Sequence, residues 1–123
     1  MTNDKIISIN GIDYIPVSET NNEMAINTDG LPYVIIRTYS AGVHAGYLKK
    51  REGREVTLVN TRRIYYWSGA CSLSQMALQG VKHPEGCKFT VVLPEILLLE
   101  AIEVIPCTIA AKLNIEGVPV WKS

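Results

Sequence analysis

Alternating apolar and polar residues near the start of the chain predict a β-hairpin. Residues 5–9 alternate, Asn10-Gly11 is the pair favoured in a two-residue type I′ turn, and residues 12–17 resume the β pattern. Residues 18–30 are instead rich in Asn, Thr, Asp and Glu, which predicts a loop or a weak, short helix. The first 30 residues thus predict one hairpin followed by an irregular segment.

Four apolar segments in the middle of the chain predict further strands, because they are rich in β-branched and aromatic residues. A turn of small residues separates the first segment from the second, and Glu52-Gly53 predicts a turn between the second and the third. The four predicted strands are residues 33–38, 43–50, 55–59 and 62–67.

The spacing of the apolar residues then changes from alternation to that of a helix, which predicts a two-turn helix over residues 72–80. Ser72 suits its N-cap, and Gly80 suits the position just after its last turn. The apolar positions that fall near one helical face are Leu73, Met76, Ala77 and Val81.

Two later apolar runs predict buried strands. Residues 89–93 and residues 98–105 are rich in Val, Ile and Leu, and Pro94 and Pro106 bound them. Both runs have the length of a strand buried in a core rather than that of a long helix.

The C-terminal part of the sequence predicts a last helix. Thr108 suits its N-cap, residues 109–113 follow, and residues 115–121 suit an extended segment docked on the domain. Hairpins first and helices later are typical of an α+β domain. We therefore expect a single domain, residues 1–123, with a mainly antiparallel β-sheet and two short helices in the C-terminal half.

Charge is balanced overall but uneven along the chain. The 12 Lys and Arg residues equal the 12 Asp and Glu residues, which excludes a generally basic nucleic-acid coat. Residues 1–30 carry five acids and one Lys, whereas residues 31–63 carry seven basic residues and two acids. This basic middle segment has two explanations: solvated strand edges that discourage aggregation, or a local anion site.

The sequence predicts a soluble protein in the cytoplasm. No stretch approaches the roughly 18 unbroken apolar residues of a membrane helix, and the N-terminus lacks the basic and apolar regions of a secretory signal. Cys71, Cys87 and Cys107 leave one cysteine unpaired in any arrangement, and their spacing matches no metal-ligand pattern. We expect reduced, partly buried thiols, with no metal and no cofactor.

The first candidate site begins at Arg37, where a predicted strand runs into a turn of small residues. Small residues let a ligand approach the backbone, whose N–H groups can hold an anion, and an Arg fork can grip a phosphate. The alternative is an ordinary hairpin turn with Arg37 in a surface ion pair. The turn residues are Ser40, Ala41, Gly42 and Val43.

The second candidate site combines arginines, aromatic residues and a small-residue turn within residues 62–72. Alternation along a strand places Arg63, Tyr65 and Trp67 on one face, and Arg62, Ile64 and Tyr66 on the other. Each face joins a cation to aromatic surface, which suits a stacked base beside a bound phosphate. The alternative is an aromatic cluster in the core or at a dimer interface.

No catalytic residue is predicted. His44 and His83 are the only histidines, and Cys71 precedes the predicted helix, where a thiol pKa can be lowered. Nothing in the sequence ties either histidine to Cys71, and no pair of carboxylates forms a general acid–base motif. The sequence therefore favours binding over catalysis.

Two long segments carry a family resemblance. They are YVIIRTYSAGVHAGYL (residues 33–48) and RRIYYWSGACSLSQMALQGV (residues 62–81), and a looser likeness runs through CKF and IEVIPC to residue 107. These segments resemble the first family of phage-encoded Thoeris anti-defence proteins. That family consists of sponges, which bind cyclic ADP-ribose isomers, the glycocyclic signals made by bacterial TIR-domain proteins, without degrading them. The resemblance implies that the chain starves a defence effector of its activator in the cytoplasm of an infected bacterial cell.

The resemblance also implies an assembly and a set of contacts. Family members are β-rich protomers with helices that form dimers with pockets built from both chains, and some form hexamers that also bind cyclic trinucleotides. A composition that is 47% hydrophobic in 123 residues independently favours a homodimer. No membrane and no long nucleic acid are expected as partners. The ligand-binding residues carried over are Arg37, Ser40, Ala41, Gly42, Val43, Arg62, Arg63, Tyr66, Trp67, Ala70 and Ser72.

These observations leave three hypotheses of function. The leading one is a sponge in which Arg37 or Arg63 contacts the pyrophosphate and Tyr66 or Trp67 stacks on adenine. The second is an enzyme that cleaves a cyclic nucleotide signal. This hypothesis is weaker, because the sequence offers no credible general base. The third is a single-stranded nucleic-acid-binding module, suggested by the basic middle segment and the Tyr-Tyr-Trp run.

Overall fold

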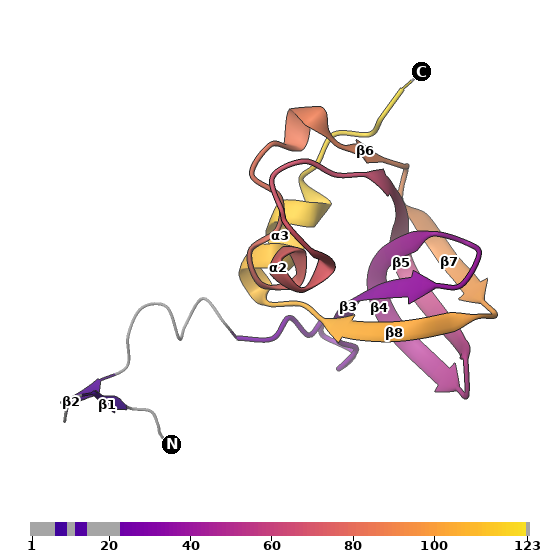
Figure 1. Ribbon diagram of the computed structural model, residues 1–123. Coiled ribbons are helices and arrows are strands. Elements are labelled where there is room, and N and C mark those ends of the chain that lie inside the picture. Colours follow the sequence, from indigo (N-terminus) through magenta and orange to yellow (C-terminus); the bar gives the residue numbers. More distant parts are fainter. Residues whose placement is uncertain (1–6, 10–11, 15–22, 123) are drawn as a thin grey trace.

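A curled antiparallel sheet and two helices make up most of the protein, whose computed structural model describes residues 7–9, 12–14 and 23–122 (Figure 1). The sheet has the order β6-β5-β4-β3-β8. β7 pairs with the same edge of β5 as β6 does, but with an earlier part of that strand. This architecture confirms the expected α+β class with both helices in the C-terminal half. The strands of this sheet are β3 (Tyr33–Thr38), β4 (Val43–Glu52), β5 (Glu55–Tyr66), β6 (Lys88–Phe89), β7 (Leu93–Leu98) and β8 (Ala101–Pro106). The two α-helices are α2 (Leu73–Gln79) and α3 (Ile109–Glu116), and η1 (Pro84–Gly86) is a single turn of 3-10 helix.

A two-residue connection makes the sheet curl. β7 and β8 pair with strands at opposite sides of the sheet, yet only residues 99–100 separate them. The Tyr39 N–H donates to the Glu100 carbonyl at 2.9 Å, and the Ala101 N–H donates to the Arg54 carbonyl at 3.0 Å. These bonds hold the two sides together around an inner core of Val34, Ile36, Val56, Leu58, Leu98 and Ala101.

A second core lies between the sheet and the helices, which Figure 1 shows side by side. Tyr33 and Ile35 point into this core, whereas the intervening Val34 and Ile36 point into the inner one. Both faces of β3 are therefore covered, which explains its nearly continuous apolar sequence. Other members of the helix-side core include Ala45, Tyr47, Ile64, Met76, Ala77, Phe89, Ala111 and Ile115.

The helix ends follow the capping predictions. The Ser72 hydroxyl accepts from the Gln75 N–H at 3.1 Å, and Gly80 has a φ of 77°, which favours glycine after a helix. The Thr108 hydroxyl accepts from the Ala111 N–H at 3.0 Å and donates to the Leu78 carbonyl at 2.7 Å. Thr108 therefore caps α3 and ties it to α2.

The N-terminal prediction is confirmed where the structure describes it. β1 (Ile7–Ile9) and β2 (Ile12–Tyr14) pair antiparallel, with residues 9 and 12 opposite each other, while the turn at residues 10–11 lies outside the described residues. Of the predicted loop, residues 23–30 form no helix, and residues 18–22 also lie outside the description.

β5 is one strand where the sequence predicts two, at residues 55–59 and 62–67. Asn60 adopts a φ of 49°, and the pairing register with β4 shifts beside it, which marks a bulge. Because side chains alternate along a strand, the extra residue exchanges the two faces. Leu58 accordingly points into the inner core, whereas Ile64, six positions later, points toward the helices.

The prediction of two buried strands at residues 89–93 and 98–105 is wrong in its bounds and its burial. Pro94 lies inside β7, and a turn at residues 99–100 interrupts the second run. Most side chains of β7 and β8 are exposed, because each strand pairs with a single described strand and lies at a margin of the sheet. Proline is tolerated at such a margin, where no partner needs its missing N–H.

The C-terminal tail docks as an extended segment from residue 118 onward, since residues 115–116 belong to α3. Val120 forms a parallel bridge with Phe89, and the Trp121 N–H donates to the Phe89 carbonyl at 2.8 Å. No helix in the described ranges is both long and apolar enough to cross a membrane.

The bulge leads to a test of stability at Gly46. A Cβ added at Gly46 would lie 2.6 Å from the Thr61 Cβ, so we expect Gly46→Ala to lower the free energy of unfolding by about 1–3 kcal/mol in urea denaturation. The control is Gly86→Ala, whose nearest neighbour would be 3.4 Å away, with an expected change within about 0.5 kcal/mol. Equal stability of the two variants would contradict a close contact at the bulge.

Candidate functional site

A cavity of about 350 Å³ lies where the turn before β4 meets the end of β5. The antiparallel register pairs Val43 with Ile64, so the small-residue turn and the aromatic end of β5 come together. Six of the residues predicted as ligand contacts line this cavity, which we call the aromatic lobe. Its lining is Ser40, Ala41, Gly42, Val43, Arg63, Ile64, Tyr65 and Trp67.

The small-residue turn is held in one conformation. The Thr38 hydroxyl donates to the Gly42 carbonyl at 2.7 Å and accepts from the Ala41 N–H at 2.8 Å. The Ser40 hydroxyl donates to the Glu100 carboxylate at 2.6 Å, and Gly42 has a φ of 84°. Ser40 therefore donates its proton to Glu100, and its hydroxyl oxygen retains the capacity to accept a hydrogen bond.

Arg63 is the charged member of the aromatic lobe. Its backbone is clamped by Thr90, because the Arg63 N–H donates to the Thr90 hydroxyl at 2.8 Å and the Thr90 N–H donates to the Arg63 carbonyl at 2.9 Å. Its guanidinium carbon lies 6.0 Å from the centre of the Tyr65 ring. Within the part of the chain that the structure describes, Arg63 forms no ion pair with a carboxylate. It is thus a positioned cation that is available to an anion.

Two aromatic residues, Tyr65 and Trp67, share the lining of the aromatic lobe with Arg63. The Trp67 Nε1–H donates to the Ala70 carbonyl at 3.2 Å, which fixes the indole. Tyr65 is 58% exposed and packs edge-on against Trp121, with ring centres 5.8 Å apart. The Lys88 ammonium lies 5.2 Å from the centre of the Trp121 ring. Trp121, from the docked C-terminal tail, therefore extends the aromatic surface, and Lys88 of β6 places a cation against it.

Tyr65 rather than Tyr66 lines the cavity, although the sequence assigned Tyr66 as a contact. Alternation along β5 already grouped Tyr65 with Arg63 and Trp67, and that signal identifies the lining residue. Trp121 was missed altogether, because no local pattern says where a docked tail will lie.

Arg62, also predicted as a ligand contact, does not line the aromatic lobe and instead holds parts of the fold together. Its side chain is buried, and it donates to the carbonyls of Thr90 at 2.9 Å, Ile115 at 3.0 Å and Val118 at 2.7 Å. Its guanidinium also lies 5.2 Å from the centre of the Phe89 ring, and burial lowers its pKa. Arg62 thus ties β5 to the end of α3 and to the loop beside β6.

The remaining predicted contacts lie outside the aromatic lobe. Arg37 is exposed and its Nε donates to the Glu103 carboxylate at 2.8 Å. Ser72 caps α2, and the Ala70 carbonyl holds Trp67. The structure therefore does not bring Arg37, Ala70 or Ser72 to the cavity lining.

A smaller cavity of about 250 Å³ adjoins the aromatic lobe and shares Arg63 with it. His44, Thr61 and Thr90 supply its other polar groups, so we call it the threonine lobe. His44 stands opposite Arg63 in the β4–β5 register. The full lining is His44, Thr61, Arg62, Arg63, Thr90, Val91, Leu93 and Ile96.

The surroundings of His44 favour its neutral form. Burial lowers its pKa, a hydrogen bond to Ala41 acts in the opposite direction, and the nearby Arg63 lowers it again. The Nε2 atom lies 2.9 Å from the Ala41 carbonyl, which can only accept, so Nε2 carries the proton. His44 thus braces the small-residue turn from the threonine lobe.

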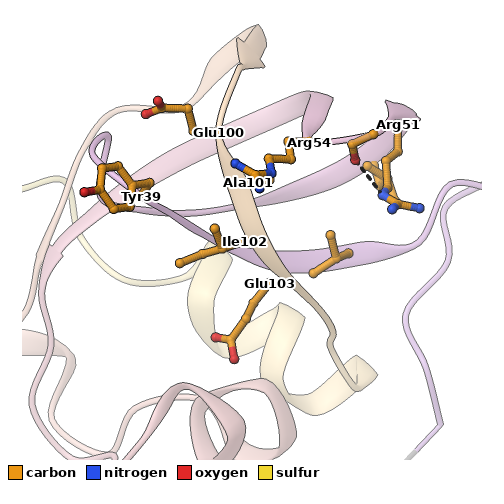
Figure 2. A pocket seen from close by; sticks show the side chains of 10 residues that line it. Tyr39, Arg51, Arg54, Glu100, Ala101, Ile102 and Glu103 are labelled. Atoms are coloured by element: carbon orange, nitrogen blue, oxygen red, sulfur yellow. Dashed lines mark hydrogen bonds between the residues drawn. The ribbon is translucent and has the colours of Figure 1, made fainter.

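A third, much larger cleft of about 1150 Å³ lies between β8 and the β4–β5 turn (Figure 2). Arg51 and Arg54 line it, but Glu100 and Glu103 line it as well. Figure 2 shows Tyr39 beside Glu100 at one end of this cleft and Arg51 at the other. Its mixed charge suits an anion less well than the aromatic lobe, which contains no carboxylate in its lining.

The candidate nucleophile and the histidines are not brought together. Cys71 is exposed, and its backbone N–H donates to the Gln75 side chain at 2.7 Å. His83 lies 3.8 Å from the Glu85 carboxylate, and His44 bonds to the turn. In residues 7–9, 12–14 and 23–122, no three His, Cys, Asp or Glu side chains gather as a metal site.

Comparison with known protein families gives a match to the central part of the sequence. A family described as a domain of unknown function, DUF6948, matches residues 31–115. The chain belongs to this family. The matched range contains every residue of both lobes, whereas Trp121 lies beyond it. No curated protein and no solved structure matches the chain.

The adjacent arginines allow function to be separated from stability. Arg62→Met should lower the free energy of unfolding by about 3 kcal/mol in urea denaturation, because three carbonyls lose their donor at roughly 1 kcal/mol or more each. Arg63→Met should leave stability within about 1 kcal/mol of wild type and weaken anionic-ligand binding by about tenfold or more. The reverse pattern would contradict these assignments.

Proposed function

We propose that the protein binds and sequesters cyclic ADP-ribose-type signalling nucleotides, the glycocyclic signals of TIR proteins, and thereby blocks Thoeris defence. The observation that carries the proposal is the aromatic lobe, where a positioned arginine without a carboxylate partner in the described chain lies between aromatic rings and a small-residue turn. The sequence resemblance to the first family of phage Thoeris anti-defence proteins supplies the ligand class.

The chemistry of the aromatic lobe matches the parts of such a ligand. Tyr65 and Trp67 offer ring faces to adenine, and base–aromatic stacking is worth about 1–3 kcal/mol. Arg63 offers a charged fork to the pyrophosphate. The hydroxyl of Ser40 accepts from a ribose hydroxyl, because its own proton is donated to Glu100.

Binding without cleavage is favoured over an enzyme because the linings of both lobes contain no Asp, Glu or Cys. Cleavage of a glycosidic or phosphodiester bond needs a positioned general acid or base. His44 is the titratable group nearest to that role, and its Nε2 proton is donated to the Ala41 carbonyl.

A single-stranded nucleic-acid module is the less favoured alternative. Such proteins use a long basic groove with successive stacking rings. Here the aromatic lobe has a volume of only about 350 Å³, and the net charge of the chain is zero. A single small dianionic nucleotide fits these features better than a strand does.

The proposed function is tested by recovery of the ligand. Protein mixed with glycocyclic ADP-ribose, separated from free ligand and then denatured by heat, should release the intact cyclic molecule in chromatography and mass spectrometry. Arg63→Met should retain about tenfold less ligand, since the pyrophosphate loses its charged partner. Release of a linear product would favour the enzyme, and tight, salt-sensitive binding of oligonucleotides alone would favour the nucleic-acid module.

We also propose that the protein functions as a homodimer, with hexamers as a further assembly that takes up cyclic trinucleotides. Exposed apolar side chains on the β7–β8 hairpin support association: Leu97, Leu99, Ile102 and Val104 are 36–60% exposed. Light scattering should give a mass of two chains or a multiple of it at micromolar concentration. A monomer at every concentration would contradict the assembly.

A further inference from the structure

We infer that two copies of this chain associate through the large cleft between β8 and the β4–β5 turn, with Arg51 of each copy against Glu100 of the other. The inference rests on the proposed homodimer and adds the surface that forms it and the charge pair that sets its orientation. The mixed charge that makes this cleft a poor anion site is the property that suits a second copy of the same chain.

The cleft carries opposite charges at its two ends. Figure 2 shows Glu100 beside Tyr39 at one end and Arg51 at the other, with Ile102 between them. A two-fold axis brings each end of a surface against the opposite end of its copy. A surface that is positive at one end and negative at the other is therefore complementary to itself, and a single contact forms two pairs of Arg51 with Glu100.

Both of these charges are available to a partner. Within the part of the chain that the structure describes, neither Arg51 nor Glu100 forms an ion pair. The Arg51 Nε donates to the Gly53 carbonyl at 3.1 Å, which holds the side chain in place. The Glu100 carboxylate accepts from the Ser40 hydroxyl at 2.6 Å and retains further accepting capacity. Glu103, the other carboxylate of the lining, is already paired within the protomer.

The rest of the cleft lining supplies an apolar centre. Leu48, Ala101, Ile102 and Val104 line the cleft together with the charged residues. Ile102 is 44% exposed, so association removes apolar surface from water at the middle of the contact. An apolar centre with a charged rim is typical of interfaces, in which the rim sets the orientation of the partners.

Charge balance favours a second copy over a partner of one sign. The lining contains two arginines and two glutamates, and the net charge of the chain is zero. A generally acidic or generally basic partner would meet a like charge at one end of the cleft, which opposes binding. A second copy related by a two-fold axis meets an opposite charge at both ends.

Charge reversal at either end tests this interface. Arg51→Glu and Glu100→Arg each place like charges at both ends of the dimer, so each should weaken self-association by about tenfold or more in light scattering across a range of concentrations. In an equimolar mixture, position 51 of each chain faces an opposite charge at position 100 of the other. The mixture should therefore recover the wild-type mass, which also shows that both variants fold. Lys82→Glu makes the same change of charge on an exposed residue outside the cleft and should associate as the wild type does.

A second pair of variants tests the apolar centre and leaves both charged ends unchanged. Ile102→Asp brings two like charges together near the two-fold axis and should weaken association by a similar factor. Leu113→Asp places the same group on α3, outside the cleft, at a position that is 59% exposed, and should leave association unchanged. Thermal melting checks that both variants are folded.

The outcomes separate the interface from the proposals on which it rests. Wild-type association of both charge-reversed variants and of Ile102→Asp would overturn this interface and leave the homodimer intact. A mixture of folded variants that does not recover the wild-type mass would overturn the pairing of Arg51 with Glu100. A wild-type chain that is a monomer at every concentration would overturn the interface together with the homodimer, whereas recovery of bound ligand tests sequestration separately.

Discussion

The connection between β7 and β8 is the constraint on which the rest of the structure depends. Two residues join strands that pair at opposite sides of the sheet, so the sheet has to curl until those sides meet. The curl encloses one core and leaves the outer face of β3 and β4 to the helices. Glu100, within the connection, also bonds to Tyr39 and Ser40, so the same constraint fixes the turn that lines the aromatic lobe.

A single bulge decides which arginine serves the site and which serves the fold. Without the extra residue at Asn60, strict alternation would send Arg62 and Leu58 to the same face. The structure instead places Leu58 in the inner core and Arg62 among the carbonyls beside α3. Two side chains of the same type, adjacent in sequence, therefore meet environments that differ in burial and in hydrogen bonding.

Local sequence signals predicted much of this fold and only part of the site. Ser72, Gly80 and Thr108 marked the helix ends correctly, because caps depend on hydrogen bonds within a few residues. The bounds of β7 and β8 could not be predicted in the same way, because an apolar run does not say whether a partner strand will cover it. The lobes depend on strand register and on the bulge, which no short sequence pattern specifies. For the same reason Arg37, which precedes the small-residue turn, pairs with Glu103 on β8, a strand that is distant in sequence but adjacent in the sheet.

The docked tail has a consequence for the order of events in folding. The bond from Trp121 to Phe89 and the bond from Arg62 to Val118 join segments that are widely separated along the chain. Contacts of such separation form late, because a long loop must close before they are made. During synthesis the sheet emerges before residue 118 does, so the rim of the aromatic lobe is among the last parts of the molecule to form. The aromatic lobe therefore gains its full aromatic surface only once the C-terminal tail has docked and Trp121 lies against Tyr65.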